Sequence, residues 1–209
     1  MSKVKKGETP IESWNGIFAD RQVGIVLYTN GLIADANKSS IKELATITSL
    51  SDYFKNNKVI RQFPELKYCT GVTNLYYTFY GCSSLTTAPV IPEGVTNLTN
   101  TFFGCSSLTT APVIPEGVTS LYSTFYGCSS LTKAPDIPAS VTNLTWTFQG
   151  CSRINGIYII NIVIPVSYSN SLSNVQAIYV PDASVSAYKT ASGWTRFKDK
   201  IFPMSDKPQ

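Results

Sequence analysis

Hydrophobic positions in the middle of the chain recur with a fixed step of 23 residues. The step holds for phenylalanine, leucine, valine and cysteine, at Phe79, Phe102, Phe125 and Phe148, at Leu75, Leu98, Leu121 and Leu144, at Val72, Val95, Val118 and Val141, and at Cys82, Cys105, Cys128 and Cys151. Thr, Ser and Asn fill most positions between them. The middle of the chain is therefore one unit used several times.

The length of the unit predicts the architecture. A period of about 20 to 29 residues is typical of leucine-rich repeats. Stacking such units places their strands in parallel, about 4.8 Å apart. We therefore predict a right-handed solenoid of leucine-rich-repeat type with 23-residue repeats, mainly β with short helical turns.

Within one unit, the apolar residues predict which side chains face the interior. In the first clean unit these are Val72, Leu75, Phe79, Cys82 and Leu85. Their spacing of three and four is typical of a helix, but Gly81 and the polar residues between them limit the prediction to a short helical turn over 77–80. The apolar run 85–92, which ends in proline, predicts one short strand per turn.

Both ends of the array depart from the repeat, as terminal repeats do. A degenerate first turn matches the unit at an offset of 25, with Ile47, Leu50, Phe54, Ile60, Pro64 and Leu66 at the equivalent positions. After the last clean unit, strands are predicted over 157–160, 162–165 and 177–181. An amphipathic helix over 183–200, interrupted at Gly193, is predicted to cover the end.

The N-terminal part does not follow the period. Residues 24–33 predict a strand, an Asn-Gly turn and a second strand. The expected division is an N-terminal docking or anchor module over 1–40, a solenoid over 41–165 and a C-terminal cap over 166–209.

Charge is scarce, at 14% of residues against about 25% in typical globular proteins. Between Gly71 and Gly150 the charged residues are Glu93, Glu116, Lys133 and Asp136. The repeats lack the basic stripe that a nucleic-acid partner requires. No window reaches the roughly 18 consecutive apolar residues of a membrane span. Because no apolar segment follows the basic start, we expect either a start without a signal peptide or a signal that was removed.

Two polar columns also follow the repeat. The five cysteines, Cys69 and the four in register, are an odd number, which argues against a complete disulfide framework. A ladder of buried reduced thiols is favoured over a disulfide or metal role. Asn74, Asn97 and Asn143, with Ser120 in the fourth turn, are predicted to be buried and to satisfy backbone groups.

The residues that most enzymes use are missing. The chain has no histidine, so the commonest general base and metal ligand is absent. No phosphate-binding motif and no close-spaced cysteine pair occurs. Glu93 and Glu116 could form a glycosidase pair, but a solvated turn is favoured because each precedes a glycine. We predict no enzyme activity, no cofactor and no metal.

Aromatic residues occupy the variable positions of the unit and are the candidate binding residues. Aromatic side chains on an uncharged surface suit stacking on sugar rings or packing on a protein. For Tyr80, Phe103 and Tyr126, a purely structural stack is the favoured alternative. For Tyr76, Tyr122 and Trp146, binding is favoured. Thr99 is taken to occupy the same position without harm to the fold, so an aromatic residue is not needed there for stability. The full candidate set is Tyr76, Tyr77, Tyr80, Phe103, Tyr122, Tyr126 and Trp146.

The units VTNLYYTFYGCSSLTTAPVIPEG, VTNLTNTFFGCSSLTTAPVIPEG and VTSLYSTFYGCSSLTKAPDIPAS resemble the BspA-like class of leucine-rich repeats. The segment from Ile178 to Lys189 is similar to the C-terminal cap of Bacteroides members. That class recurs in surface proteins of gut and oral bacteria and in phage fibre or decoration proteins. The resemblance covers about 47–203 and implies adhesion or recognition.

Two functions are compatible with these features. The first is a bacteriophage virion fibre or decoration protein, with 1–40 contacting other virion proteins and the solenoid displayed for adhesion, in a homo-oligomer such as a trimer. The alternative is a bacterial cell-surface or extracellular adhesin that binds host protein or glycan.

Overall fold

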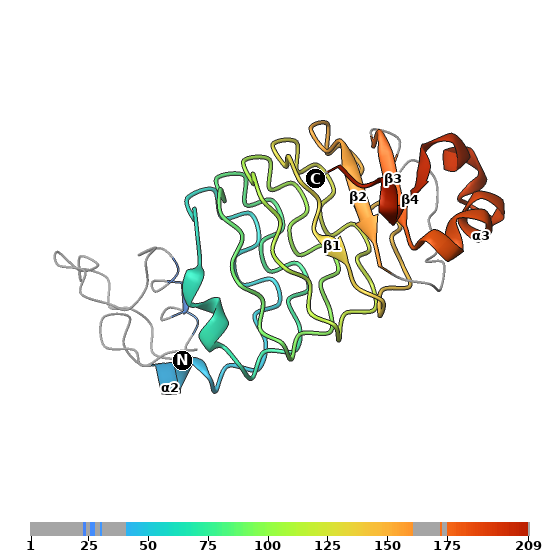
Figure 1. Cartoon of the computed structure of the whole chain (residues 1–209). Helices are drawn as coiled ribbons and strands as arrows, with labels where there is room; N and C mark the ends of the chain where they lie inside the picture. Colours follow the sequence, from blue (N-terminus) through green and yellow to red (C-terminus); the bar gives the residue numbers. More distant parts are fainter. Residues whose placement is uncertain are drawn as a thin grey trace, which may run out of the picture.

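The structure, a computed structural model, describes residues 23, 26, 27, 30, 41–160, 172 and 175–208. Its turns lie side by side in one row (Figure 1). Parallel bridges join equivalent residues of neighbouring turns, in one row through Asn74, Asn97, Ser120 and Asn143 and in a second through Thr87, Thr110 and Lys133. The chain is therefore a repeat solenoid, as predicted.

The interior is built from the inward columns that the sequence predicts. Val72, Leu75, Phe79, Cys82 and Leu85 are each 0% exposed. Neighbouring phenylalanine rings stack face to face with centroids 5.5–5.7 Å apart, through Phe54, Phe79, Phe102, Phe125 and Phe148. Complete burial of one such ring stabilises a fold by about 1.5–3 kcal/mol.

The segment 75–82 is a series of tight turns, and the predicted helical turn over 77–80 is wrong. Alternate residues donate within the turn, as Thr78 N–H does to the Leu75 carbonyl (3.1 Å). The residues between donate to the next turn, as Phe79 N–H does to the Thr101 carbonyl (2.9 Å). Tyr77 has a φ of 57°, in the left-handed region, which ends any α-helix. This alternation produces the helix-like apolar spacing without a helix.

The strand predicted over 85–92 is also wrong in most turns. In the first clean unit only Thr87 forms a bridge there, because Pro89 and Pro92 have no N–H to donate. In the part of the repeat that is equivalent to 85–92, a regular strand first occurs as β1 (Asp136–Ile137).

Beyond the clean units the chain forms a sheet. It consists of β1, β2 (Gly156–Ile159), β3 (Ala177–Val180) and β4 (Ile201–Pro203), in this order and all parallel. The strands predicted over 157–160 and 177–181 are confirmed as β2 and β3. The strand predicted over 162–165 lies outside the described residues.

Short helices lie between β3 and β4 and after β4. They are η2 (Asp182–Ser184), α3 (Val185–Thr190), η3 (Thr195–Lys200) and η4 (Met204–Asp206), and α3 lies at the far end of the row (Figure 1). The predicted helix is therefore divided into α3 and η3, and the break contains Gly193, with a φ of 81°. Tyr188 and Trp194 are 0% exposed and meet edge to face, with centroids 5.0 Å apart.

The other end begins with α2 (Ile41–Leu44) and a turn that includes η1 (Pro64–Tyr68). This is the predicted degenerate first turn: Ser49 bridges Asn74, and Phe54 stacks on Phe79. Its apolar residues Ile47, Leu50, Phe54, Ile60 and Leu66 are all buried.

The strand–turn–strand prediction for 24–33 is wrong at its described residues. Val23, Val26 and Leu27 are helical, and Asn30 N–H donates to the Val26 carbonyl (3.2 Å). Val23 and Leu27 are four apart and both 0% exposed, a spacing that places two residues on the same face of a helix.

Candidate recognition surface

Buried hydroxyls and thiols in the repeats bond to the backbone of the preceding turn. The Thr101 hydroxyl donates to the Leu75 carbonyl (2.8 Å), and the Cys105 thiol donates to the Phe79 carbonyl (3.1 Å). Burial raises the pKa of the Cys82 thiol to about 12 and that of Cys105 well above its ordinary value. All five cysteines are free and buried. The cysteine column is therefore a structural ladder of neutral thiols.

The asparagine column satisfies backbone groups, as predicted. Each side-chain oxygen accepts from the N–H two residues further on at 2.9 Å, in Asn74, Asn97 and Asn143, and Ser120 does the same at 3.3 Å. These side chains are half-buried, so the prediction of burial is wrong. The bond is made at the rim of the turn, where the backbone is only partly covered.

A second column shares an unusual backbone conformation. Tyr77, Asn100, Ser123 and Trp146 have φ values of 51–57°, in the left-handed region. We call these four residues the left-handed column. Trp146 therefore aligns with Asn100, whereas Thr99 aligns with Tyr76 and Tyr122. The comparison of Trp146 with Thr99 in the sequence was wrong by one residue.

The aromatic residues three positions further on form an outer stack. The Tyr80 and Phe103 rings lie 4.6 Å apart with planes 10° from parallel, and the Phe103 and Tyr126 rings 4.5 Å apart with planes 3° from parallel. All three side chains are half-buried. These three residues therefore form the stack between neighbouring turns that was the favoured alternative to binding.

Next to this stack lies an open groove with a volume of about 480 Å³. Five of the seven candidate residues line it, namely Tyr77, Phe103, Tyr122, Tyr126 and Trp146. The other two flank it: the Tyr76 ring meets the Tyr77 ring edge to face at 4.3 Å, and Tyr80 stacks on Phe103. The sequence thus identified residues that the fold gathers on one surface.

The groove also contains polar residues that the sequence analysis missed. Asn100, Ser123 and Gln149 complete its lining. Their register could have revealed them, since Asn100 and Ser123 align with Tyr77, and Gln149 aligns with Tyr126. Asn100 is 7% exposed and Ser123 3% exposed, so both lie deep in the groove.

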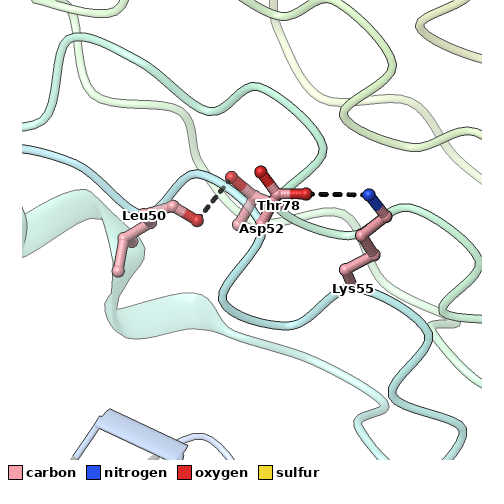
Figure 2. A network of polar contacts seen from close by, with 4 residues as sticks. All are labelled: Leu50, Asp52, Lys55 and Thr78. Carbon is pink, nitrogen blue, oxygen red and sulfur yellow. Dashed lines mark hydrogen bonds and ion pairs between the residues drawn. The ribbon is translucent and has the colours of Figure 1, made fainter. Parts of the chain in front are cut away.

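Lys55 lies against the aromatic residues at one end of this surface. Its ammonium is 4.4 Å from the centroid of the Tyr77 ring and 5.6 Å from that of Tyr80. It also pairs with the Asp52 carboxylate at 3.0 Å, beside the bond from the Thr78 hydroxyl to the Leu50 carbonyl (Figure 2). The hydrogen bond that the Lys55 ammonium donates to the Asp52 carboxylate is the main cause that raises the pKa of Lys55.

The side chains that line the groove carry no formal charge. Glu93 and Glu116 are exposed and line a different hollow, together with Val90 and Val113. In the part of the chain that the structure describes, no group of three or more His, Cys, Asp or Glu residues could hold a metal ion. Within the same residues, no helix is long and apolar enough to cross a membrane.

A solenoid of stacked turns of this length, with columns of buried leucine and other apolar residues inside, is typical of leucine-rich repeat proteins. The family described as "BspA type Leucine rich repeat region (6 copies)" matches residues 38–155 and 72–191. The chain belongs to this family. Members are typically protein-binding or adhesion proteins, commonly at the bacterial surface or extracellular, and are generally non-enzymatic.

Two solved structures are similar to the chain. One is a leucine-rich repeat protein from Bacteroides ovatus ATCC 8483, with 16% identity and a TM-score of 0.45, covering 65% of this chain and 36% of that one. The other is an internalin from Listeria monocytogenes str. 4b F2365, with 12% identity and a TM-score of 0.26, covering 79% of this chain and 57% of that one. The chain thus spans about a third of the length of the first and just over half of the second. No curated protein matches.

Proposed function

We propose that the chain is a non-enzymatic recognition protein that binds its partner through the aromatic groove. The observation that carries this proposal is Trp146, a large aromatic residue that is 38% exposed and has a φ of 56°. A bulky side chain in the left-handed region costs about 1–3 kcal/mol. Asparagine tolerates this conformation much better, and Asn100 occupies it two turns earlier.

The backbone conformation at this position therefore does not require tryptophan. The same backbone is held by Asn100 and Ser123 in the two preceding turns. Strained residues of this kind concentrate at functional sites, where binding compensates for the loss of stability. Tyr77, with a φ of 57°, is a second such residue at the other end of the left-handed column.

An adhesion assay tests this function. Fluorescently labelled protein would be applied to intact Bacteroides cells, cultured epithelial cells and immobilised extracellular-matrix proteins. The double variant Tyr77→Asn/Trp146→Asn should lose at least about tenfold in binding to the surface that the native chain binds. Val113→Thr, an 86% exposed residue outside the groove, is the matched control and should bind as the native chain does. Equal binding by the double variant would exclude the groove as the site.

The second part of the proposal concerns location. We place the protein on a bacteriophage virion as a fibre or decoration, with residues 1–40 docking on the particle and the solenoid displayed, in a homo-oligomer such as a trimer. The resemblance of the repeats to phage fibre proteins supports this placement. A cell-surface adhesin that binds host protein or glycan is the alternative. Deletion of residues 1–40 should abolish copurification with phage particles, and a truncated chain that still copurifies would contradict the docking role.

The finer features of the fold belong to the same proposal. We take the repeat to be 23 residues long and the coil to be right-handed, with a solenoid over 41–165 and a cap over 166–209. Bridges between residues 23 apart support the repeat length. The strong preference of parallel crossovers for the right-handed sense supports the handedness. The buried Tyr188 and Trp194 support a capping role for the C-terminal helices.

A further inference from the structure

We propose that the ligand of the groove is a neutral oligosaccharide that stacks on Trp146 and extends along the groove towards Tyr77. This inference rests on the recognition function proposed above and assigns its ligand class. It follows from the shape of the groove, from the side chains at its floor and from its lack of charge.

The left-handed column gives the groove its shape. Along the column the residues are large, small, small and large: Tyr77, Asn100, Ser123 and Trp146. Three turn spacings of about 4.8 Å separate the two aromatic residues, a span of about 14 Å. The volume of about 480 Å³ lies within the range of about 300–1,000 Å³ that is usual for small-ligand sites. A protein partner would typically cover about 800 Å² on each side, so the groove suits a short chain of rings better.

The floor offers hydrogen-bonding groups that the fold leaves unused. Asn100 and Ser123 are more than nine-tenths buried and line the groove. Among the residues that the structure describes, neither the Asn100 amide nor the Ser123 hydroxyl has a hydrogen-bond partner. Their polar atoms are not sealed inside the core, so both groups remain open to the groove. Amides and hydroxyls both donate and accept, which matches the hydroxyl groups of a sugar.

The walls complete the match with a sugar. Trp146 is 38% exposed and meets Tyr122 edge to face, with centroids 5.4 Å apart. In contrast, the Phe103 ring has a ring stacked on each face, so it offers mainly its edge. The Tyr77 ring is covered as well, since the Tyr80 ring stacks on it with centroids 5.0 Å apart and the Lys55 ammonium lies 4.4 Å from its centroid. Contacts with the apolar C–H face of a sugar ring therefore fall mainly on Trp146.

The absence of charge decides against acidic and basic ligands. A charged ligand would lose hydration in the groove and find no opposite charge among the residues that line it. Lys55, at the Tyr77 end, already pairs with the Asp52 carboxylate and lies over the Tyr77 ring. A neutral polyhydroxyl ligand has no charge to desolvate and needs no opposite charge in the groove.

Titration calorimetry with defined sugars tests the inference. The probes are tetrasaccharides of the cello, malto, laminari, manno and chito series, with a tetragalacturonate as the acidic comparison. At least one neutral probe should bind the full chain with a Kd of about 1 mM or lower, and the tetragalacturonate should bind at least about tenfold more weakly.

Variants at three positions locate the site. Trp146→Asn should weaken that binding by about tenfold or more. Asn100→Gly, which keeps the left-handed backbone accessible, should weaken it about threefold to tenfold through the lost hydrogen bonds. Val113→Thr should leave the affinity unchanged. If no neutral probe binds, or if Trp146→Asn binds equally well, the inference is overturned.

The adhesion assay separates this failure from failure of the proposed function. If surface binding depends on Trp146 but no sugar binds, the groove recognises a protein and only the ligand class is wrong. If neither surface nor sugar binding responds to Trp146→Asn, both proposals fall.

Discussion

Two columns run through the same turns of the solenoid, one inside and one on the surface. The inner column holds phenylalanine in five successive turns, 0–2% exposed, with neighbouring rings 5.5–5.7 Å apart. The left-handed column holds a different residue in each of four turns, yet φ varies only from 51° to 57°. Packing therefore fixes the inner residue, whereas the surface residue can change while the backbone stays the same.

The hydrogen bonds between turns explain how this backbone is maintained. Tyr77 N–H donates to the Thr99 carbonyl (3.3 Å) and Asn100 N–H to the Tyr122 carbonyl (3.1 Å), each reaching into the next turn. Because every turn is held by its neighbour, the left-handed conformation persists even where the side chain disfavours it. The surface column is thus available for recognition at a limited loss of stability.

The largest effect is expected at the inner column. Phe102→Ala should lower the free energy of unfolding by about 3–5 kcal/mol, because it leaves a cavity between two stacked rings. The neighbouring variant Phe103→Ala, in the half-buried outer stack, should lose only about 1–2 kcal/mol. Urea unfolding of both variants measures the difference. Equal losses would remove the distinction between an inner and an outer column.

A second test concerns the reactivity of the buried thiols. Burial raises the pKa of Cys82 from its ordinary 9.0 to about 12, so its thiolate fraction at pH 8 is about 1000-fold lower than that of an exposed thiol. A thiol-specific reagent should react with all five cysteines in urea and slowly with the native chain. Rapid native reaction at Cys82 would contradict its inward position.

The same shift predicts a pH dependence of stability. The pKa of the Cys82 thiol is higher in the folded chain than in the unfolded chain, so folding favours the neutral thiol. This contribution is fully present below about pH 9 and is lost as the pH rises towards 12. Urea midpoints measured from pH 7 to 11 should decline above pH 9 and decline less in Cys82→Ala. An equal decline in both chains would rule out this linkage.

A smaller effect is expected for the buried threonines. Thr101→Val removes the hydroxyl that donates to the Leu75 carbonyl but keeps the shape of the side chain. The loss should be about 1 kcal/mol, because the Leu75 carbonyl still accepts from Thr78 N–H. Exposed Thr109, changed to Val in the same way, is the control. A loss above about 3 kcal/mol would mean that the hydroxyl supports more than this one bond.

The sequence predicted the parts of the fold that depend on periodic burial. The inward columns, the degenerate first turn, β2 and β3 all follow from which positions are apolar. The local backbone was not predictable in this way, because tight turns with left-handed residues and a short helical turn produce the same apolar spacing. The strand over 85–92 failed for a related reason: burial is retained there, but the prolines remove the donors that a ladder requires.

The candidate surface was predictable in its aromatic residues and not in its polar ones. Tyr77 and Trp146 are conspicuous as large residues at variable positions. Asn100 and Ser123 look like ordinary turn residues, and only their shared register with Tyr77 and their burial show that they form the floor of a groove. The misalignment of Trp146 with Thr99 has a simpler origin, since Trp146 lies two steps of 23 residues after Asn100 and the register alone gives the correct alignment.

The measurement that tests the account most directly is the free energy of unfolding of Trp146→Asn. Asparagine fits the left-handed backbone that Trp146 strains, as Asn100 does in the same solenoid. Urea unfolding should therefore give a stability equal to that of the native chain or higher by up to about 1 kcal/mol. A loss of more than about 1 kcal/mol would show that Trp146 serves the fold, and would contradict the assignment of this column to recognition.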